Sequence, residues 1–199
     1  MAGGGAYNQW GSSSWSAEAP PLQDRLLNPS QRARFEEEVV PRLDAAYNLA
    51  RWLTGNDHDA DDVVQEAYLR AVKFFDSFRG GDARPWLLAI VRRVCYDWLK
   101  RTRSQPLAVF DEELHSDPKA SVDPAQLLVT QEDRELLRHA VGALPIAFRE
   151  VLVLRELEGM SYKEIAVIAD IPVGTVMSRL ARARAQLEQG LLKHRSEEP

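Results

Sequence analysis

The chain has 199 residues, of which 45% are apolar, so a packed core is expected and wholesale disorder is excluded. Its single cysteine, Cys95, cannot form an internal disulfide, no apolar run reaches membrane-spanning length, and the N-terminus has no secretory signal pattern. We therefore expect a soluble cytoplasmic protein with no direct membrane insertion.

The charge is distributed unevenly along the chain. The formal net charge of −5 by itself speaks weakly against a nucleic-acid partner. However, six basic residues fall between residues 84 and 103 and five between residues 174 and 195, while acids gather at residues 57–66 and 111–135. This pattern predicts two anion-binding surfaces and separate surfaces for another partner.

The first part of the chain predicts a tail and three helices. Residues 1–30 are rich in Gly, Ser, Ala and Pro, which is typical of a disordered N-terminal tail. Helical spacing follows at residues 31–53, with a kink at Pro41, then at residues 59–75 and 83–101. Because short loops join these helices, we expect them to share one core, in a first domain of residues 31–103.

The helix at residues 59–75 carries both an apolar stripe and acidic residues. We expect its first turn to contain Asp59, Asp61 and Asp62, where the helix dipole favours negative charge. The positions expected on or near its buried stripe are Val63, Ala67, Leu69, Val72 and Phe75.

A linker separates this domain from a second one. Residues 104–124 contain three prolines, several acids and no long apolar periodicity. Helical spacing resumes in residues 125–193, and no segment shows the alternation of a β-strand. The expected fold is all-α, with two small helical domains joined by a flexible acidic linker.

The stretch from Ser161 to Gly190 has the pattern of a helix-turn-helix. Ser161 and Glu164 match a capping box, and Pro172 and Gly174 are expected to end the first helix and turn the chain. The second helix is basic, as in helices that enter a DNA major groove. The alternative is an αα-hairpin whose arginines are merely solvated. Asp170 stands where such turns often carry glycine, and aspartate can adopt the left-handed conformation.

Other constellations favour structural interpretations. One histidine among helix-start carboxylates, in the run His58–Asp62, is not a metal-ligand set of known spacing. Cys95, Trp86 and Trp98 are expected in the core, whereas a phosphate-binding role and a solvated face remain open for Arg92 and Arg93. No catalytic residues, metal or cofactor are expected, and the protein is not expected to be an enzyme.

Three stretches, in this order, are similar to one bacterial family. They are DADDVVQEAYLRAVKFFDSFRG at residues 59–80, ARPWLLAIVRRVCYDWLKR at residues 83–101, and LPIAFREVLVLRELEGMSYKEIAVIADIPVGTVMSRLARARAQL at residues 144–187. The chain resembles an extracytoplasmic-function (ECF) sigma factor, most specifically in GMSYKEIA followed by IPVGTVMSRLARAR. The resemblance implies binding of core RNA polymerase and promoter-specific transcription initiation.

In the first domain, the resemblance implies recognition and melting of the promoter's −10 element. The implied −10 contacts are Arg79, Gly80, Asp82, Arg84, Arg92 and Arg93. Many members have an asparagine where this chain has Arg93, so the resemblance does not specify the −10 base preference. The implied contacts with the polymerase clamp are Asp61, Asp62, Gln65 and Glu66. The linker resembles the family's connector, which threads the polymerase.

In the second domain, the resemblance implies recognition of the −35 element. The implied contacts are Thr175, Met177, Ser178, Arg179, Ala181 and Arg182. Met177 and Ala181 are apolar where relatives often carry basic or larger residues, so they can touch a thymine methyl but cannot read guanine. Arg182 is then the strongest candidate for a bidentate guanine contact.

Two other functions are weighed against the sigma factor. A conventional helix-turn-helix regulator would bind duplex DNA without a polymerase-binding face. A sigma-like decoy would bind an anti-sigma factor and no DNA, but such decoys tend to lose the recognition-helix arginines that this chain keeps. The resemblance also implies an anti-sigma factor as a partner, beside core RNA polymerase and promoter DNA.

Overall fold

The computed structural model describes residues 27–103 and 131–197, and the first of these segments forms a four-helix domain. Its elements are α1 (Pro29–Glu38), a 3₁₀ turn (Val40–Arg42), α2 (Leu43–Thr54), α3 (Asp57–Lys73), a 3₁₀ turn (Phe75–Ser77) and α4 (Ala83–Arg103). The 3₁₀ turn at Pro41 is the expected kink. The N-terminal tail was predicted to run to residue 30, but Asn28 caps a helix that begins at Pro29. The tail's first 26 residues lie outside the described residues.

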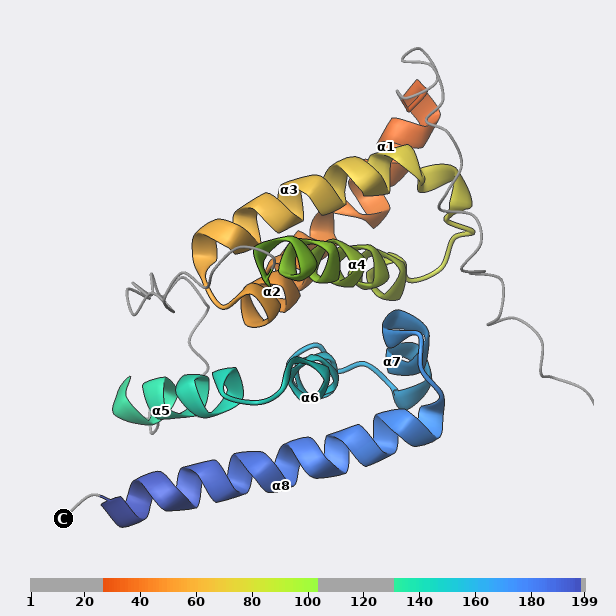
Figure 1. Ribbon diagram of the computed structural model, residues 1–199. Coiled ribbons are helices and arrows are strands. Elements are labelled where there is room, and N and C mark those ends of the chain that lie inside the picture. Colours follow the sequence, from red (N-terminus) through yellow and green to blue (C-terminus); the bar gives the residue numbers. More distant parts are fainter. Residues whose placement is uncertain (1–26, 104–130, 198–199) are drawn as a thin grey trace, which may run out of the picture.

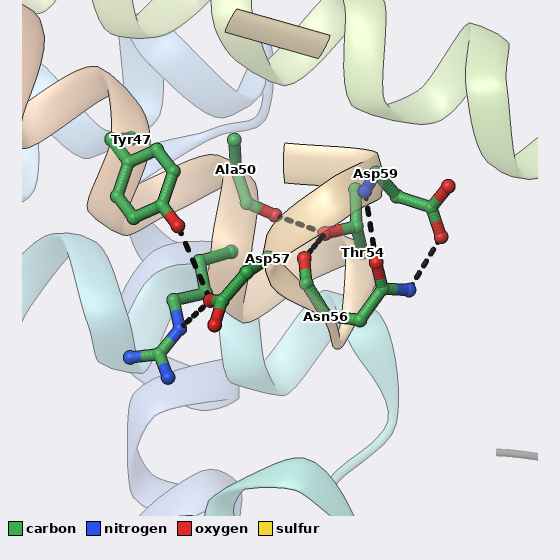
Figure 2. A network of polar contacts seen from close by, with 7 residues as sticks. Tyr47, Ala50, Thr54, Asn56, Asp57 and Asp59 are labelled. Atoms are coloured by element: carbon green, nitrogen blue, oxygen red, sulfur yellow. Dashed lines mark hydrogen bonds and ion pairs between the residues drawn. The ribbon is translucent and has the colours of Figure 1, made fainter. Parts of the chain in front are cut away.

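The junction between α2 and α3 is held by side chains that bond to the local backbone (Figure 2). Gly55 ends α2 in the left-handed conformation, with φ of 93°. The Asn56 side chain accepts a 2.8 Å hydrogen bond from the Asp59 N–H and so caps α3. Because this cap starts α3 at Asp57, the acids of its first turn are Asp57 and Asp59. The prediction that placed Asp61 and Asp62 in that turn is wrong.

The second described segment forms the other helical domain. It contains α5 (Gln131–Gly142), α6 (Ile146–Leu152) extended by a π-helical turn (Val153–Leu157), α7 (Tyr162–Ala169) and α8 (Val173–Glu197). Residues 27–103 and 131–197 contain no strand, in agreement with the predicted all-α fold. The predicted linker, residues 104–124, and the start of the helix expected at residue 125 lie outside the described residues.

The turn before α8 differs from its prediction in one respect. The carbonyl of Pro172 accepts hydrogen bonds from the N–H groups of Thr175 at 2.9 Å and Val176 at 3.1 Å. The helix therefore begins at Val173. Gly174 lies inside the first turn of α8 and is not part of the connection between the two helices.

The two domains pack directly against each other. Helix α4 lies against α7, α2 lies against α6, and α8 runs along α5, α6 and α7 (Figure 1). One continuous buried cluster joins Leu87 and Val91 of the first domain to Val151, Leu154 and Ile165 of the second. Cys95 and Trp86 are buried, as predicted, whereas Trp98 is half-buried and packs against the edge of the core. The domain interface is thus part of the core.

Candidate nucleic-acid interface

The helix-turn-helix has the predicted local structure. The Ser161 hydroxyl accepts a hydrogen bond from the Glu164 N–H at 3.3 Å, and the Glu164 carboxylate accepts one from the Ser161 N–H at 2.7 Å. Asp170 ends α7 in the left-handed conformation, with φ of 53°. This capping box and turn set the entry of the chain into α8.

Helix α8 has one face in the core and one in solvent. Val176, Leu180 and Ala183 are buried. Among the residues predicted to contact the −35 element, those that are exposed are Met177, Ser178, Ala181 and Arg182. Thr175 and Arg179 are half-buried, and the Thr175 carbonyl accepts a 3.0 Å hydrogen bond from the Ser178 hydroxyl. The start of α8 therefore presents a contiguous mixed polar and apolar face.

The loop before α4 carries half of the predicted −10 contacts. Gly80 and Gly81 both have left-handed backbones, with φ of 86° and 91°. Residues that carry a side chain rarely adopt this conformation. Arg79, Gly80 and Asp82 are exposed. The Asp82 carboxylate accepts a 3.0 Å hydrogen bond from the Arg84 N–H, so it caps the start of α4.

Two of the other predicted −10 contacts, Arg92 and Arg84, face the second domain, while Arg93 is exposed on α4. The guanidinium of Arg92 forms an ion pair with Glu150 of α6, and the Tyr96 hydroxyl donates to the other Glu150 oxygen at 3.0 Å. Arg84 lies 3.6 Å from the carboxylate of Glu158, which also accepts a 3.4 Å hydrogen bond from Asn48. The sequence pattern gave no indication of these pairings.

Glu150 and Glu158 are the buried charged residues of the described chain, 0% and 5% exposed. Burial raises the pKa of Glu150, while Arg92, the Tyr96 hydroxyl and Arg179 oppose that rise. Burial also raises the pKa of Glu158, against the effect of Arg84 and Asn48. Burial and the nearby Glu150 charge raise the pKa of Tyr96 to about 12. The interface therefore encloses two carboxylates at a cost in desolvation.

The predicted polymerase-binding residues lie on the outer face of α3. Asp61, Asp62 and Gln65 are exposed, and Glu66 is half-buried. The Glu66 carboxylate accepts a 2.8 Å hydrogen bond from Arg70. The same Arg70 guanidinium also donates a hydrogen bond to the carboxylate of Asp97 in α4.

Leu69 was predicted on or near the buried stripe of α3, and that prediction is wrong. Its side chain is 65% exposed and lines a groove of about 410 Å³ with Glu66, Arg70 and residues of α4. At 100° per residue, Leu69 lies opposite Ala67 and Ala71, which are buried. A helical-wheel count from those alanines could have found it.

In residues 27–103 and 131–197, no cluster of three or more metal-ligating side chains is assembled. None of the helices in these ranges is sufficiently long and apolar to cross a membrane.

Two known protein-family patterns match the two domains of this chain. Sigma-70 region 2 matches residues 39–105, and Sigma-70 region 4 matches residues 134–187. The chain belongs to the ECF RNA polymerase sigma factors, because it is also 38% identical to one of them over 84% of its length. The two regions correspond to the two helical domains, so the sequence resemblance is confirmed.

Two proteins named as ECF RNA polymerase sigma factors are similar in sequence to most of this chain. It is 38% identical to the ECF RNA polymerase sigma-E factor of Escherichia coli K12, covering 84% of this chain and 91% of that protein. It is 33% identical to the ECF RNA polymerase sigma factor SigE of Mycolicibacterium smegmatis, covering 87% of this chain and 66% of that protein.

Solved structures of sigma factors have the same fold. The sigma factor RpoE of Bartonella quintana, in complex with the anti-sigma factor NepR, aligns with a TM-score of 0.66 and 29% identity over 80% of this chain and 97% of that one. CnrH, in complex with the cytosolic domain of CnrY, aligns with a TM-score of 0.57 and 28% identity over 86% and 94%.

Proposed function

We propose that this sigma factor binds core RNA polymerase and directs promoter-specific transcription initiation through one surface on each domain. The observation that carries the proposal is the pairing of a region 2 domain and a region 4 domain in one chain. A conventional helix-turn-helix regulator would not need the first of these domains. The protein itself makes no RNA and is not an enzyme, and it acts in the cytoplasm, where the polymerase is.

The start of α8 reads the −35 element in the major groove. Arg182 is exposed and can form a bidentate contact with the O6 and N7 atoms of guanine. Met177, 54% exposed, and Ala181 offer apolar contact to thymine methyl groups. Thr175, Ser178 and Arg179 contact the backbone or adjacent base edges.

The first domain captures the melted −10 strand. Gly80 and Gly81 give the loop between Arg79 and Asp82 a left-handed backbone, which suits a tight turn around an unstacked base. Arg84, Arg92 and Arg93 extend this surface along α4 and bind the phosphates of the single strand.

The outer face of α3 binds the polymerase. Asp61, Asp62, Gln65 and Glu66 supply the polar contacts, and Leu69 adds an exposed apolar side chain farther along the same face. A polar rim around an apolar anchor is the usual composition of a protein interface. An anti-sigma factor is a further partner, as one is for the Bartonella quintana RpoE.

In vitro transcription tests the proposal. The full chain is added to core RNA polymerase over a library of promoter fragments. Transcripts that appear only with this protein are the expected result. Failure to bind core polymerase would refute the proposal, and binding to duplex DNA without polymerase-dependent transcripts would favour a conventional regulator.

A further inference from the structure

We propose that Glu150 and Glu158 form an intramolecular latch, whose carboxylates occupy Arg92 and Arg84 as DNA phosphates would and hold the free protein closed. The inference rests on the −10 role of these arginines in the proposed function. We call the pairs Arg92–Glu150 and Arg84–Glu158 the latch.

The positions of the two carboxylates carry this inference. The buried charged residues of the described chain both come from the second domain, and both are matched to an arginine of α4. Glu150 lies 58 residues from Arg92 along the chain, so only the docking of the domains brings them together. Where a carboxylate and a phosphate compete for the same guanidinium, the domain that supplies the carboxylate excludes the nucleic acid.

Helix α8 is also linked to this interface. The charge of Arg179, a predicted −35 contact, acts on Glu150 together with that of Arg92. Glu150 thus lies within the field of arginines from both DNA-binding surfaces. The ion pair of Glu150 itself is with Arg92 of the first domain.

One arginine of the latch, Arg84, is not fully satisfied. The Nε–H of Arg84 is buried and has no acceptor among the described residues. Burial raises the pKa of both glutamates, so their desolvation outweighs the attraction of their partners. The charged pairs therefore specify which surfaces meet, because closing the domains on an unpaired glutamate would bury an uncompensated carboxylate. Such an interface can open when polymerase and DNA offer better contacts.

The consequence for binding follows from the population of the open form. If only a fraction of the free protein is open, its apparent dissociation constant for DNA is the intrinsic constant divided by that fraction. Opening the latch should then tighten binding to single-stranded DNA.

Charge reversal tests the latch in the full-length chain. Glu150→Lys places a cation against Arg92 in a buried contact, so the domains should separate. The matched control is Glu156→Lys, which makes the same charge change in the same domain, where Glu156 is exposed and bonds Arg184 at 2.6 Å. The double variant Arg92→Glu with Glu150→Lys restores an opposite-charge pair and should close the protein again.

Two measurements are made on each variant. Small-angle X-ray scattering reports the maximum dimension, and fluorescence anisotropy reports affinity for a short labelled single-stranded oligonucleotide of mixed sequence. We expect Glu150→Lys to be expanded and to bind about tenfold more tightly than Glu156→Lys. Unchanged dimensions would overturn the latch. Expansion with an affinity equal to that of Glu156→Lys would overturn the masking of the arginines.

A milder variant guards against loss of folding. Tyr96→Phe removes the 3.0 Å hydrogen bond to Glu150 without changing charge, and should give a smaller expansion. Circular dichroism checks that each variant keeps its helices. In vitro transcription by the wild-type chain tests the proposed function separately, because it does not depend on a change at residue 150.

Discussion

Arg149 of α6 donates a 3.0 Å hydrogen bond from Nη1 to the backbone carbonyl of Trp52 in α2, 97 residues away along the chain. The same guanidinium donates to the carbonyls of Gly142, the last residue of α5, and Leu144, in the loop before α6. One side chain of α6 therefore joins the end of α5 and the α5–α6 loop to a helix in the other domain. This contact accompanies the latch but involves no predicted DNA-binding residue.

Replacing Arg149 with alanine should destabilise the second domain. Carbonyl groups at the α5–α6 connection would lose their donor in a half-buried place, at a cost of about 1–3 kcal/mol. Urea denaturation monitored by circular dichroism measures the loss. Lys163→Ala, at an exposed position on α7, is the control and should change stability by less than about 0.5 kcal/mol. An equal effect of the two substitutions would show that the carbonyls do not depend on Arg149.

Replacing Asp170 with glycine should stabilise the helix-turn-helix. Asp170 has a left-handed backbone, which is strained for residues with a Cβ, and its side chain is exposed. We expect Asp170→Gly to raise the free energy of unfolding by up to about 1 kcal/mol. The β-branched Asp170→Val should lower it, since branching makes the left-handed region less accessible. Thermal unfolding compares the three proteins, and a higher Tm for valine than for glycine would contradict the strain.

Replacing Arg182 with alanine should weaken recognition of the −35 element. If Arg182 contacts a guanine, the loss at the cognate sequence is about 1–3 kcal/mol, and preference at that base relaxes. Promoter-library transcription with core polymerase measures both effects. Gln189→Ala, exposed farther along α8, is the control. An unchanged base preference in Arg182→Ala would remove this residue from the reading set.

Replacing Leu69 with alanine should weaken binding to core polymerase without lowering stability. The side chain is 65% exposed in the free protein, so its truncation leaves no cavity. An apolar anchor buried on binding is worth about 1–2 kcal/mol, or roughly a tenfold change in Kd. Competition with wild-type protein for core polymerase measures the affinity. A variant that competes as well as wild type would place Leu69 outside the interface.

Cys95 should be unreactive in the folded protein at ordinary pH. Burial, with the nearby Glu150 charge, raises the pKa of its thiol to about 12, and the reactive thiolate exists only as pH approaches that value. At pH 8 a thiol reagent should label Cys95 slowly in the native state and rapidly in urea. Fast labelling of the native protein would show that the site is accessible to solvent.

Local sequence patterns determined much of this molecule. Helical periodicity, the Ser161–Glu164 capping box and the left-handed Asp170 depend on residues close together in the chain, so the all-α fold and the helix-turn-helix were predictable. The motifs at residues 59–80, 83–101 and 144–187 were sufficient for the family. The prediction for Gly174 was wrong because proline and glycine are both common turn residues, so the sequence did not separate Pro172 from Gly174. The hydrogen bonds that the Pro172 carbonyl accepts show where the helix begins.

The tertiary structure alone decided how the domains meet. Nothing in the sequence near Glu150 distinguishes it from a solvated acid, since its burial depends on α4 arriving from more than 50 residues away. Short-range patterns record local backbone preferences, but the burial of a charge or an apolar side chain is set by long-range packing.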